Sequence, residues 1–234
     1  AENLAKDYGI TREQADEYAV MSHKRATAAW AEKRFADELV PVSVPKKRGE
    51  TELFAEDEGY RADASMQTLG ALKPIEKNGI VTAGNASQQN DAAAACLVVA
   101  EDKLEELSLQ PRAWFHSWAA AGCDPSRMGI GPVPAVERLF KRTGLGWKDI
   151  DLVELNEAFA PQVLAVLKGW GWDDRDKLNV NGSGISLGHP IGATGGRILA
   201  NLVNELERRG GRYGLETMCI GGGQGLAAVF ERAT

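Results

Sequence analysis

The sequence has no excess of positive charge and no long apolar run, and each absence excludes a class of protein. Its 234 residues include 27 Lys and Arg against 33 Asp and Glu. This net charge of −6 gives a nucleic-acid partner no electrostatic support. The longest apolar stretch, residues 92–100, is far too short to cross a bilayer, and the first residues show no signal-peptide pattern. We therefore expect neither a nucleic-acid nor a membrane partner.

Cysteine is scarce as well. Three cysteines occur, Cys96, Cys123 and Cys219, without a C-x-x-C pair. An odd and scattered set favours reduced thiols, so we expect a cytoplasmic protein without a bound metal. The chain starts without methionine, and its first residues already have a sequence pattern typical of a helix. We therefore expect it to be a fragment or a processed piece.

The hydrophobic pattern predicts a long helix near the start of the chain and an alternation of strands and helices after residue 112. Thr11 is the expected N-cap of a helix that continues to about residue 35. Residues 79–87 are expected to form a strand and a turn, and residues 101–109 a helix. Later strands are expected at 113–122, 149–155, 215–221 and 225–232, and later helices at 133–144, 157–170 and 194–210. This alternation indicates an α/β layered domain.

The stretch NGSGISLGHPIGATGGR, residues 181–197, places six glycines around His189, one of three histidines in the chain. Each glycine costs conformational entropy on folding, so the stretch indicates close backbone approach or free N–H groups aimed at a ligand. A P-loop is excluded because the stretch has no lysine, and its glycine spacing does not fit the Rossmann pattern. A single histidine is more often structural than catalytic, so other motifs must decide which role His189 has.

Two further blocks end predicted strands with an amide or a thiol. Cys219 closes one predicted strand before the glycines 221–223, and Asn156 closes another in the stretch LVELNEAFA. Taken singly, Cys219 is best explained as a small buried hydrophobe and Asn156 as a helix N-cap. Ligands bind at strand ends of α/β sheets, however. An Asn, a His and a Cys in such places therefore form a candidate acid/base and oxyanion site.

Four blocks, in this order, resemble the signatures of the thiolase family: VTAGNAS, NEAFA, GHPIGATG and CIGGGQG. The resemblance extends over essentially the whole chain. It implies a thiolase-like layered α/β fold with a C-terminal βαβαβαββ half and part of the loop domain. Residues 1–86 would belong to the loop domain, 87–110 to the closing elements of the N-terminal half, and 111–234 to the C-terminal half.

Enzymes of this family form or cleave a carbon–carbon bond between acyl-CoA thioesters, and the resemblance implies catalytic roles. His189 would activate a nucleophilic cysteine and help to hold a thioester oxygen, because the thiolate is the nucleophile. Cys219 would be the second acid/base, which takes the α-proton of an acetyl group in synthesis and returns it in cleavage. Asn156 would hold a water that stabilises the enolate oxygen together with His189.

The resemblance also implies substrate contacts. Ser87 would face the pantetheine arm of coenzyme A, and Ala158 and Phe159 would line the pocket. Gly221 and Gly222, at the oxyanion loop, would leave room for a flat thioester. CoA thioesters are then substrates, and no permanently bound cofactor is expected. The family implies a homodimer or homotetramer, with a role in fatty acid metabolism.

The acylated cysteine of the family lies upstream of the VTAGNAS block, where this chain has no cysteine. We therefore expect an N-terminal thiolase segment to be missing and this chain alone to be inactive. The alternative is a non-catalytic acyl-CoA- or lipid-binding protein, although such a protein needs no acid/base pair. A decarboxylative condensing enzyme of related fold typically uses two histidines, or His and Asn, where this chain has His189 and Cys219.

Overall fold

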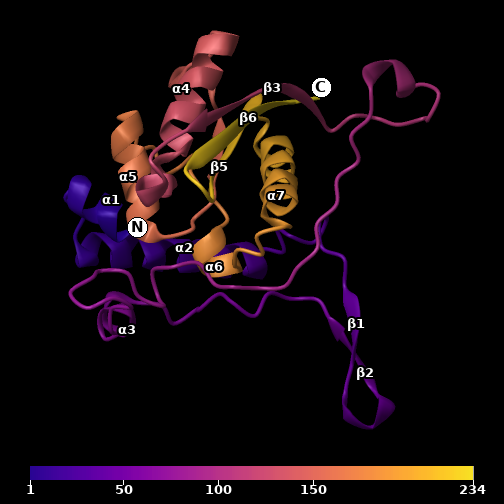
Figure 1. The fold of residues 1–234 in the computed structure, drawn as a ribbon. Helices are drawn as coiled ribbons and strands as arrows, with labels where there is room; N and C mark the ends of the chain where they lie inside the picture. The colour runs from indigo at the N-terminus through magenta and orange to yellow at the C-terminus, as the bar shows by residue number, and fades with distance from the viewer. Residues whose placement is uncertain (234) are drawn as a thin grey trace.

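A four-stranded mixed sheet lies at the centre of the second half of the chain in the computed structural model, which describes residues 1–233. Its strands are β3 (Ala113–Gly122), β4 (Leu152–Leu155), β5 (Tyr213–Ile220) and β6 (Gln224–Arg232), in the order β3-β6-β5-β4. β4 runs parallel to β5, and the other neighbours are antiparallel. Helices α4 (Pro132–Thr143) and α5 (Ala160–Trp170) lie to one side of the sheet and α7 (Thr194–Arg209) to the other (Figure 1). The expected alternation of strands and helices is confirmed.

The local sequence explains where these helices end. α4, α5 and α7 each stop at a glycine in the left-handed conformation, namely Gly144, Gly171 and Gly210. That conformation strains residues with a Cβ atom, so glycine is favoured at a helix C-terminus. Leu155 and Leu215, on neighbouring strands, are fully buried in the core between sheet and helices. Within residues 1–233, no helix is both long and apolar enough to span a bilayer.

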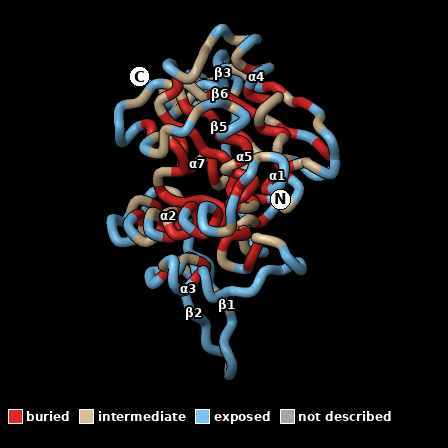
Figure 2. Tube along the Cα trace, turned by 90° about the vertical axis from the view of Figure 1, so that its left-hand side faces the viewer, coloured by how far each residue is buried: buried red, intermediate tan, exposed pale blue. Residues whose placement is uncertain are grey.

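Helix α2 (Arg12–Ala31) is the expected long helix near the start, although it ends at Ala31 rather than at about residue 35. Thr11 is its N-cap, as predicted: Oγ1 of Thr11 accepts the Gln14 N–H, and Oε1 of Gln14 accepts the Thr11 N–H. The other elements of this region are α1 (Glu2–Asp7), β1 (Val42–Pro45), β2 (Thr51–Phe54) and α3 (Met66–Gly70). The β1–β2 hairpin projects from the body and is largely exposed, whereas much of α2 is buried (Figures 1 and 2).

Between α5 and α7 the chain forms no full strand, although the implied βαβαβαββ order places one there. Leu178 makes an isolated parallel bridge to Val153 of β4. The side chain of the buried Asn179 then takes the place of a ladder partner, since its Nδ2 donates to the carbonyl of Leu155 and its Oδ1 accepts the Leu155 N–H. The short helix α6 (Gly184–Leu187) follows and ends before the His-Pro pair.

The segment that joins the two regions is more irregular than expected. Residues 101–109, expected as a helix, form a single 3₁₀ turn, η2 (Glu101–Lys103), followed by non-helical turns. Residues 79–87, expected as a strand and a turn, contain an isolated bridge at Ala86 in place of a strand. A short helix is marginal without a packing surface, and most of residues 101–109 are exposed. The helix prediction for this segment was therefore wrong.

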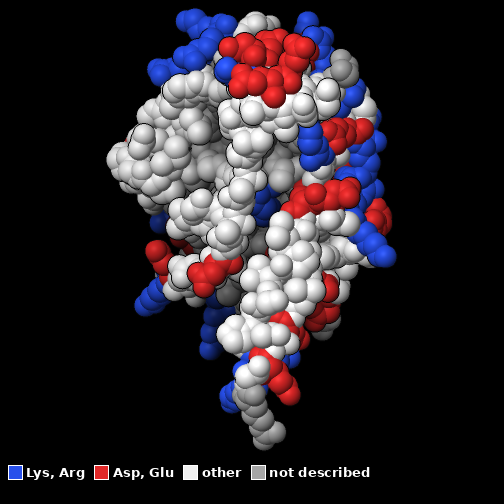
Figure 3. Space-filling view, turned by 90° about the vertical axis from the view of Figure 1, so that its right-hand side faces the viewer, with Lys and Arg blue, Asp and Glu red and all other residues white. Residues whose placement is uncertain are grey.

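Apolar surface is exposed on this segment and on the sheet. Leu97 and Val98 are 77% and 84% exposed, and Phe115 and Trp118 of β3 are 57% and 48% exposed. On the side that carries α7, charged side chains border a hollowed area of uncharged atoms (Figure 3). Exposed apolar side chains that gather on one face mark a candidate surface for contact with further polypeptide.

Candidate active site

Asn156 follows the last residue of β4, at the carboxyl end of the strand. Its backbone N–H still donates to the carbonyl of Thr217 on β5, at 3.0 Å, and the residue is fully buried. The expected role as a helix N-cap was wrong, because α5 begins at Ala160 and Phe159 occupies the N-cap position. The side-chain amide of Asn156 is therefore not used in capping and turns towards the glycine-rich stretch.

The structure brings together Asn156 and His189, two of the three residues of the predicted site. Nδ2 of Asn156 lies 3.3 Å from Nε2 and 3.4 Å from Nδ1 of His189. On its other side, Nδ1 of His189 lies 2.7 Å from Oγ1 of Thr194. Asn156 and Thr194 thus contact the ring from two sides. The backbone of His189 is held separately, because its N–H donates to the carbonyl of Gln88, at 3.0 Å.

The imidazole of His189 is half-buried. Burial, and secondly the positive charge of Arg197, hold its pKa below the ordinary value of 6.5. His189 is therefore neutral at neutral pH, and one of its ring nitrogens carries a lone pair that can accept a proton.

The carboxylate of Glu157, next to the site asparagine in sequence, anchors this loop from inside. Glu157 is fully buried, and its two oxygens accept four hydrogen bonds. The donors are the Tyr18 hydroxyl (2.9 Å), the Asn179 amide (3.1 Å), the Ser22 hydroxyl (2.6 Å) and the Ile185 N–H (3.2 Å). A buried carboxylate is tolerated only when its oxygens are satisfied in this way, so the network ties α2 and α6 to the end of β4.

The three residues predicted to contact substrate also lie together. The N–H of Ser87 donates to the carbonyl of Ala158, at 2.9 Å, and Ala86 forms an isolated bridge to Phe159. Ala158 is buried, whereas Ser87 and Phe159 are half-buried. The VTAGNAS and NEAFA blocks, about 70 residues apart in the chain, thus form one wall beside the site.

Cys219 lies near the end of β5, as predicted, and pairs with Gly225 of β6. Burial raises the pKa of its thiol above the ordinary value of 9.0, so the resting thiol keeps its proton. Among the described residues it makes no side-chain hydrogen bond to His189 or Asn156. Its predicted place in the same site therefore stays a prediction.

The glycine run after β5 has two positions with a left-handed backbone, Gly222 and Gly223, and at Gly223 a Cβ atom would also overlap neighbouring atoms. A Cβ atom at Gly221 would meet no other atom within 4 Å, and Gly222 also has open space around it, although its φ of +88° strains any residue that carries a Cβ atom. Gly223 has a φ of +91°, and a Cβ atom there would overlap the carbonyl oxygen of Cys123 and approach the nitrogen of Pro125 to 2.8 Å. The roles predicted for Gly221 and Gly222 stay predictions.

Sequence reasoning missed Thr194 and Gln88, which hold the ring and the backbone of His189. Thr194 was read only as the start of a helix. The available signal was its place in the first turn of α7, five residues after the histidine in GHPIGATG, where a hydroxyl can turn back on the preceding loop. Gln88 acts through its backbone carbonyl, for which no side-chain pattern exists.

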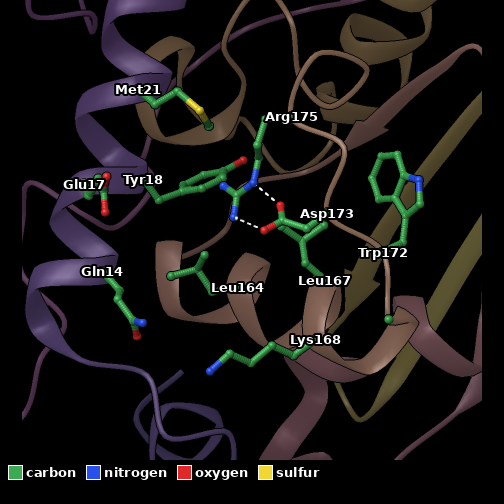
Figure 4. Close-up of a pocket in the computed structure, with 11 residues that line it drawn as sticks. Gln14, Glu17, Tyr18, Met21, Leu164, Leu167, Lys168, Trp172, Asp173 and Arg175 are labelled. Atoms are coloured by element: carbon green, nitrogen blue, oxygen red, sulfur yellow. Dashed lines mark hydrogen bonds and ion pairs between the residues drawn. The ribbon is translucent and has the colours of Figure 1, made fainter.

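A separate groove of about 720 Å³ lies between α2 and the C-terminal end of α5 (Figure 4). Arg175 lies over the ring of Tyr18 there, 5.1 Å from its centroid, and pairs with Asp173. None of the predicted site residues lines this groove. It is therefore not part of the candidate active site.

Comparison with known protein families gives two consecutive matches. The model described as thiolase, N-terminal domain, matches residues 1–102, and that described as thiolase, C-terminal domain, matches residues 109–232. The second match alone covers more than half of the chain.

Curated relatives are similar over almost all of this chain. An acetyl-CoA acetyltransferase of Cupriavidus necator is 50% identical over 233 residues, which cover 99% of this chain and 59% of the relative. A 3-ketoacyl-CoA thiolase of Idiomarina loihiensis is 50% identical over 236 residues, which cover 99% of this chain and 61% of the relative. The chain thus spans about three fifths of the length of these relatives.

Solved structures share the fold. The crystal structure of the Bacillus anthracis acetyl-CoA acetyltransferase matches with a TM-score of 0.96 and 46% identity, over 99% of this chain and 59% of that chain. Human mitochondrial 3-ketoacyl-CoA thiolase in complex with CoA matches with a TM-score of 0.89 and 44% identity, over 100% of this chain and 58% of that chain. The expected thiolase-like layered α/β fold is confirmed.

Proposed function

The chain belongs to the thiolase family, and on that premise we propose that it supplies acid/base and oxyanion groups for acyl transfer between acyl-CoA thioesters. The reaction is formation of a 3-ketoacyl-CoA by Claisen condensation, or its thiolytic cleavage. The observation that carries the proposal is the contact between the amide of Asn156 and the imidazole of His189, at the carboxyl end of β4. Strand ends in α/β sheets are where such sites are built.

His189 activates the nucleophile in this proposal. Its lowered pKa supports the role, because a neutral imidazole can take the proton of a cysteine thiol and leave a thiolate. The acyl group then passes to that sulfur as the thiolate of CoA leaves. The proton held by His189 can return to the departing CoA sulfur.

Cys219 serves as the second acid/base. In condensation its thiolate removes the α-proton of acetyl-CoA, and the resulting enolate carbon attacks the acyl-cysteine carbonyl. The acyl–sulfur bond then breaks, the nucleophilic cysteine leaves as a thiolate, and the proton held by Cys219 neutralises that thiolate. In cleavage its thiol returns a proton to the departing enolate carbon. The raised pKa of Cys219 supports the cleavage role, because the resting group is the protonated acid. His189 and a water held by Asn156 stabilise the enolate oxygen.

Coenzyme A thioesters are the proposed substrates, without a permanently bound cofactor. Ser87 faces the pantetheine arm and Ala158 and Phe159 line the pocket, while Gly221 and Gly222 leave room for the thioester. Support comes from the wall that the first three of these residues form beside Asn156.

We further propose that polypeptide outside these 234 residues supplies the nucleophile and covers the apolar face that contains Phe115 and Trp118. Neither Cys96, which is exposed, nor Cys123 makes a hydrogen bond to His189 among the described residues. On this view residues 1–86 belong to the loop domain, 87–110 close the N-terminal half, and 111–234 form the C-terminal half. We also propose that the assembled protein is a cytoplasmic homodimer or homotetramer and that it acts in fatty acid metabolism.

The test is a thiolysis assay with acetoacetyl-CoA on the chain alone and on the chain co-expressed with an upstream thiolase segment that carries a reactive cysteine. We expect activity only from the combination. In that combination, His189→Ala and Cys219→Ser should each lower kcat by about 10²–10⁴-fold, and Asn156→Ala by about 10²–10³-fold. Cys219→Ser should still become acylated on the upstream cysteine. Near-normal condensation by Cys219→Ser would refute its acid/base role, and robust turnover by the chain alone would refute the external nucleophile.

A further inference from the structure

The hydroxyl of Thr194 lies between the ring of His189 and a backbone carbonyl. Its Oγ1 is 2.7 Å from Nδ1 of His189 and 3.0 Å from the carbonyl oxygen of Pro190. Thr194 is the first residue of α7 and is fully buried, and its backbone N–H donates to the same carbonyl, at 2.9 Å. The position of the hydroxyl is thus set by the helix start, not by the imidazole.

The chemistry of these three groups orients the hydrogen bonds. A carbonyl oxygen can only accept, and a hydroxyl has a single hydrogen to donate. When Thr194 donates that hydrogen to Pro190, its oxygen presents only lone pairs towards Nδ1 of His189. Nδ1 must then carry the ring hydrogen, because two lone pairs at 2.7 Å would repel each other.

The amide of Asn156 does not make this choice. Its Nδ2 lies almost equally far from both ring nitrogens, at 3.3 and 3.4 Å, so it favours neither tautomer. His189 is neutral near neutral pH because burial lowers its pKa, and a neutral imidazole can carry its hydrogen on either ring nitrogen. Thr194 is the partner that distinguishes between them.

We propose that Thr194 is a positioning residue that holds His189 as the Nδ1–H tautomer and leaves the lone pair on Nε2. The use of that lone pair, to take the proton of the nucleophilic thiol, rests on the proposed function. In the tautomer held by Thr194, Nε2 is ready to accept the proton without a prior rearrangement. When the imidazolium forms, its Nδ1–H stays bonded to Thr194, so the ring keeps its orientation through the proton transfer.

The tautomer can be read directly by ¹⁵N NMR of the chain labelled only at histidine. The sequence has three histidines, and His23 is an internal reference, because its Nδ1 accepts the Arg61 N–H at 3.2 Å and so belongs to the opposite tautomer. We expect a protonated-type Nδ1 signal and a lone-pair-type Nε2 signal for His189. Signals are assigned with His23→Asn and His116→Gln variants. The labelled chain is measured together with the unlabelled upstream segment, so that only its own histidines give signals.

Two substitutions separate the effect of the Thr194 hydroxyl from that of the branched side-chain shape. Thr194→Ser keeps the hydroxyl and should leave both His189 signals unchanged. Thr194→Val keeps the branched shape and removes the hydroxyl, and its His189 signals should move towards a mixture of tautomers, while unchanged His23 signals show that the fold persists. A wild-type His189 with the hydrogen on Nε2, or a Thr194→Val spectrum identical to wild type, would overturn the proposal.

Activity provides the second readout. In the complete enzyme, Thr194→Val should lower kcat/KM by about 10–100-fold and Thr194→Ser by less than about threefold, as expected for loss or retention of an orienting hydrogen bond. The pH profile of kcat/KM should shift for Thr194→Val only. If NMR shows the Nδ1–H tautomer but His189→Ala retains activity, the proposed function fails and the assignment of Thr194 stands. If His189 is essential but carries the hydrogen on Nε2, the assignment alone fails.

Discussion

Replacement of Glu157 by glutamine should destabilise the fold, because it exchanges an acceptor for a donor inside a fully buried network. An amide group in place of Oε2 would face two donors. The Ser22 hydroxyl can turn away, but the N–H of Ile185 would lose its acceptor. The reverse orientation would place the amide against the donors Tyr18 and Asn179. Either orientation leaves at least one buried donor without a partner.

The magnitude follows from these bonds. An orphaned buried donor costs about 1–3 kcal/mol, and each remaining bond to a neutral oxygen is weaker than one to a carboxylate by about 1 kcal/mol. Glutamine carries no charge, so the variant avoids the desolvation cost of a buried carboxylate, and this offsets part of the loss. We therefore expect Glu157→Gln to lower the free energy of unfolding by about 2–4 kcal/mol, a large share of a typical total of about 5–15 kcal/mol.

Urea unfolding followed by tryptophan fluorescence measures the change, with wild type and variant in the same state of assembly. Tyr18→Phe is the matched control, because it removes one of the four donors and leaves the carboxylate in place. It should cost less than Glu157→Gln. A Glu157→Gln midpoint equal to wild type would show that the carboxylate does not organise this network.

Three further expectations concern packing and pH. Gly225→Ala should destabilise the fold by at least about 1–3 kcal/mol, because its Cβ would overlap the backbone of Gly131, whereas Gly221→Ala, with open space around it, should leave the melting temperature unchanged. Burial raises the pKa of Glu216 from 4.5 to about 8, so the stability it contributes below pH 4.5 is lost as pH rises through 8. Glu216→Gln should therefore melt at a higher temperature than wild type above pH 8 and match it near pH 4. Burial lowers the pKa of His23 from 6.5 to about 4, so its contribution is present above pH 6.5 and lost as pH falls through 4. His23→Asn should flatten the fall in melting temperature over that range, and an unchanged slope would contradict the assignment.

Much of the second half could be predicted because its signals are local. The strand 113–122 was predicted at the bounds that β3 has, and the end of α7 follows from the glycine at position 210. The N-cap at Thr11 rests on a hydrogen bond to a residue only three positions away. The helix predicted at 101–109 fails for the opposite reason, since its formation depends on a packing surface that its own sequence does not contain.

The sequence by itself determined which strands and helices alternate in the second half, which family the motifs resemble, and which side chains are chemically fit for acid/base work. Only the tertiary structure decided that the amide of Asn156 is free of helix capping and meets His189. It also decided that Tyr18, 139 residues from Glu157, donates to that carboxylate, and that Thr194 orients the imidazole. Helix caps and strand periods depend on neighbours within a few residues. Partners in a buried polar network are brought together by the packing of distant segments, and no local pattern records which of them will meet.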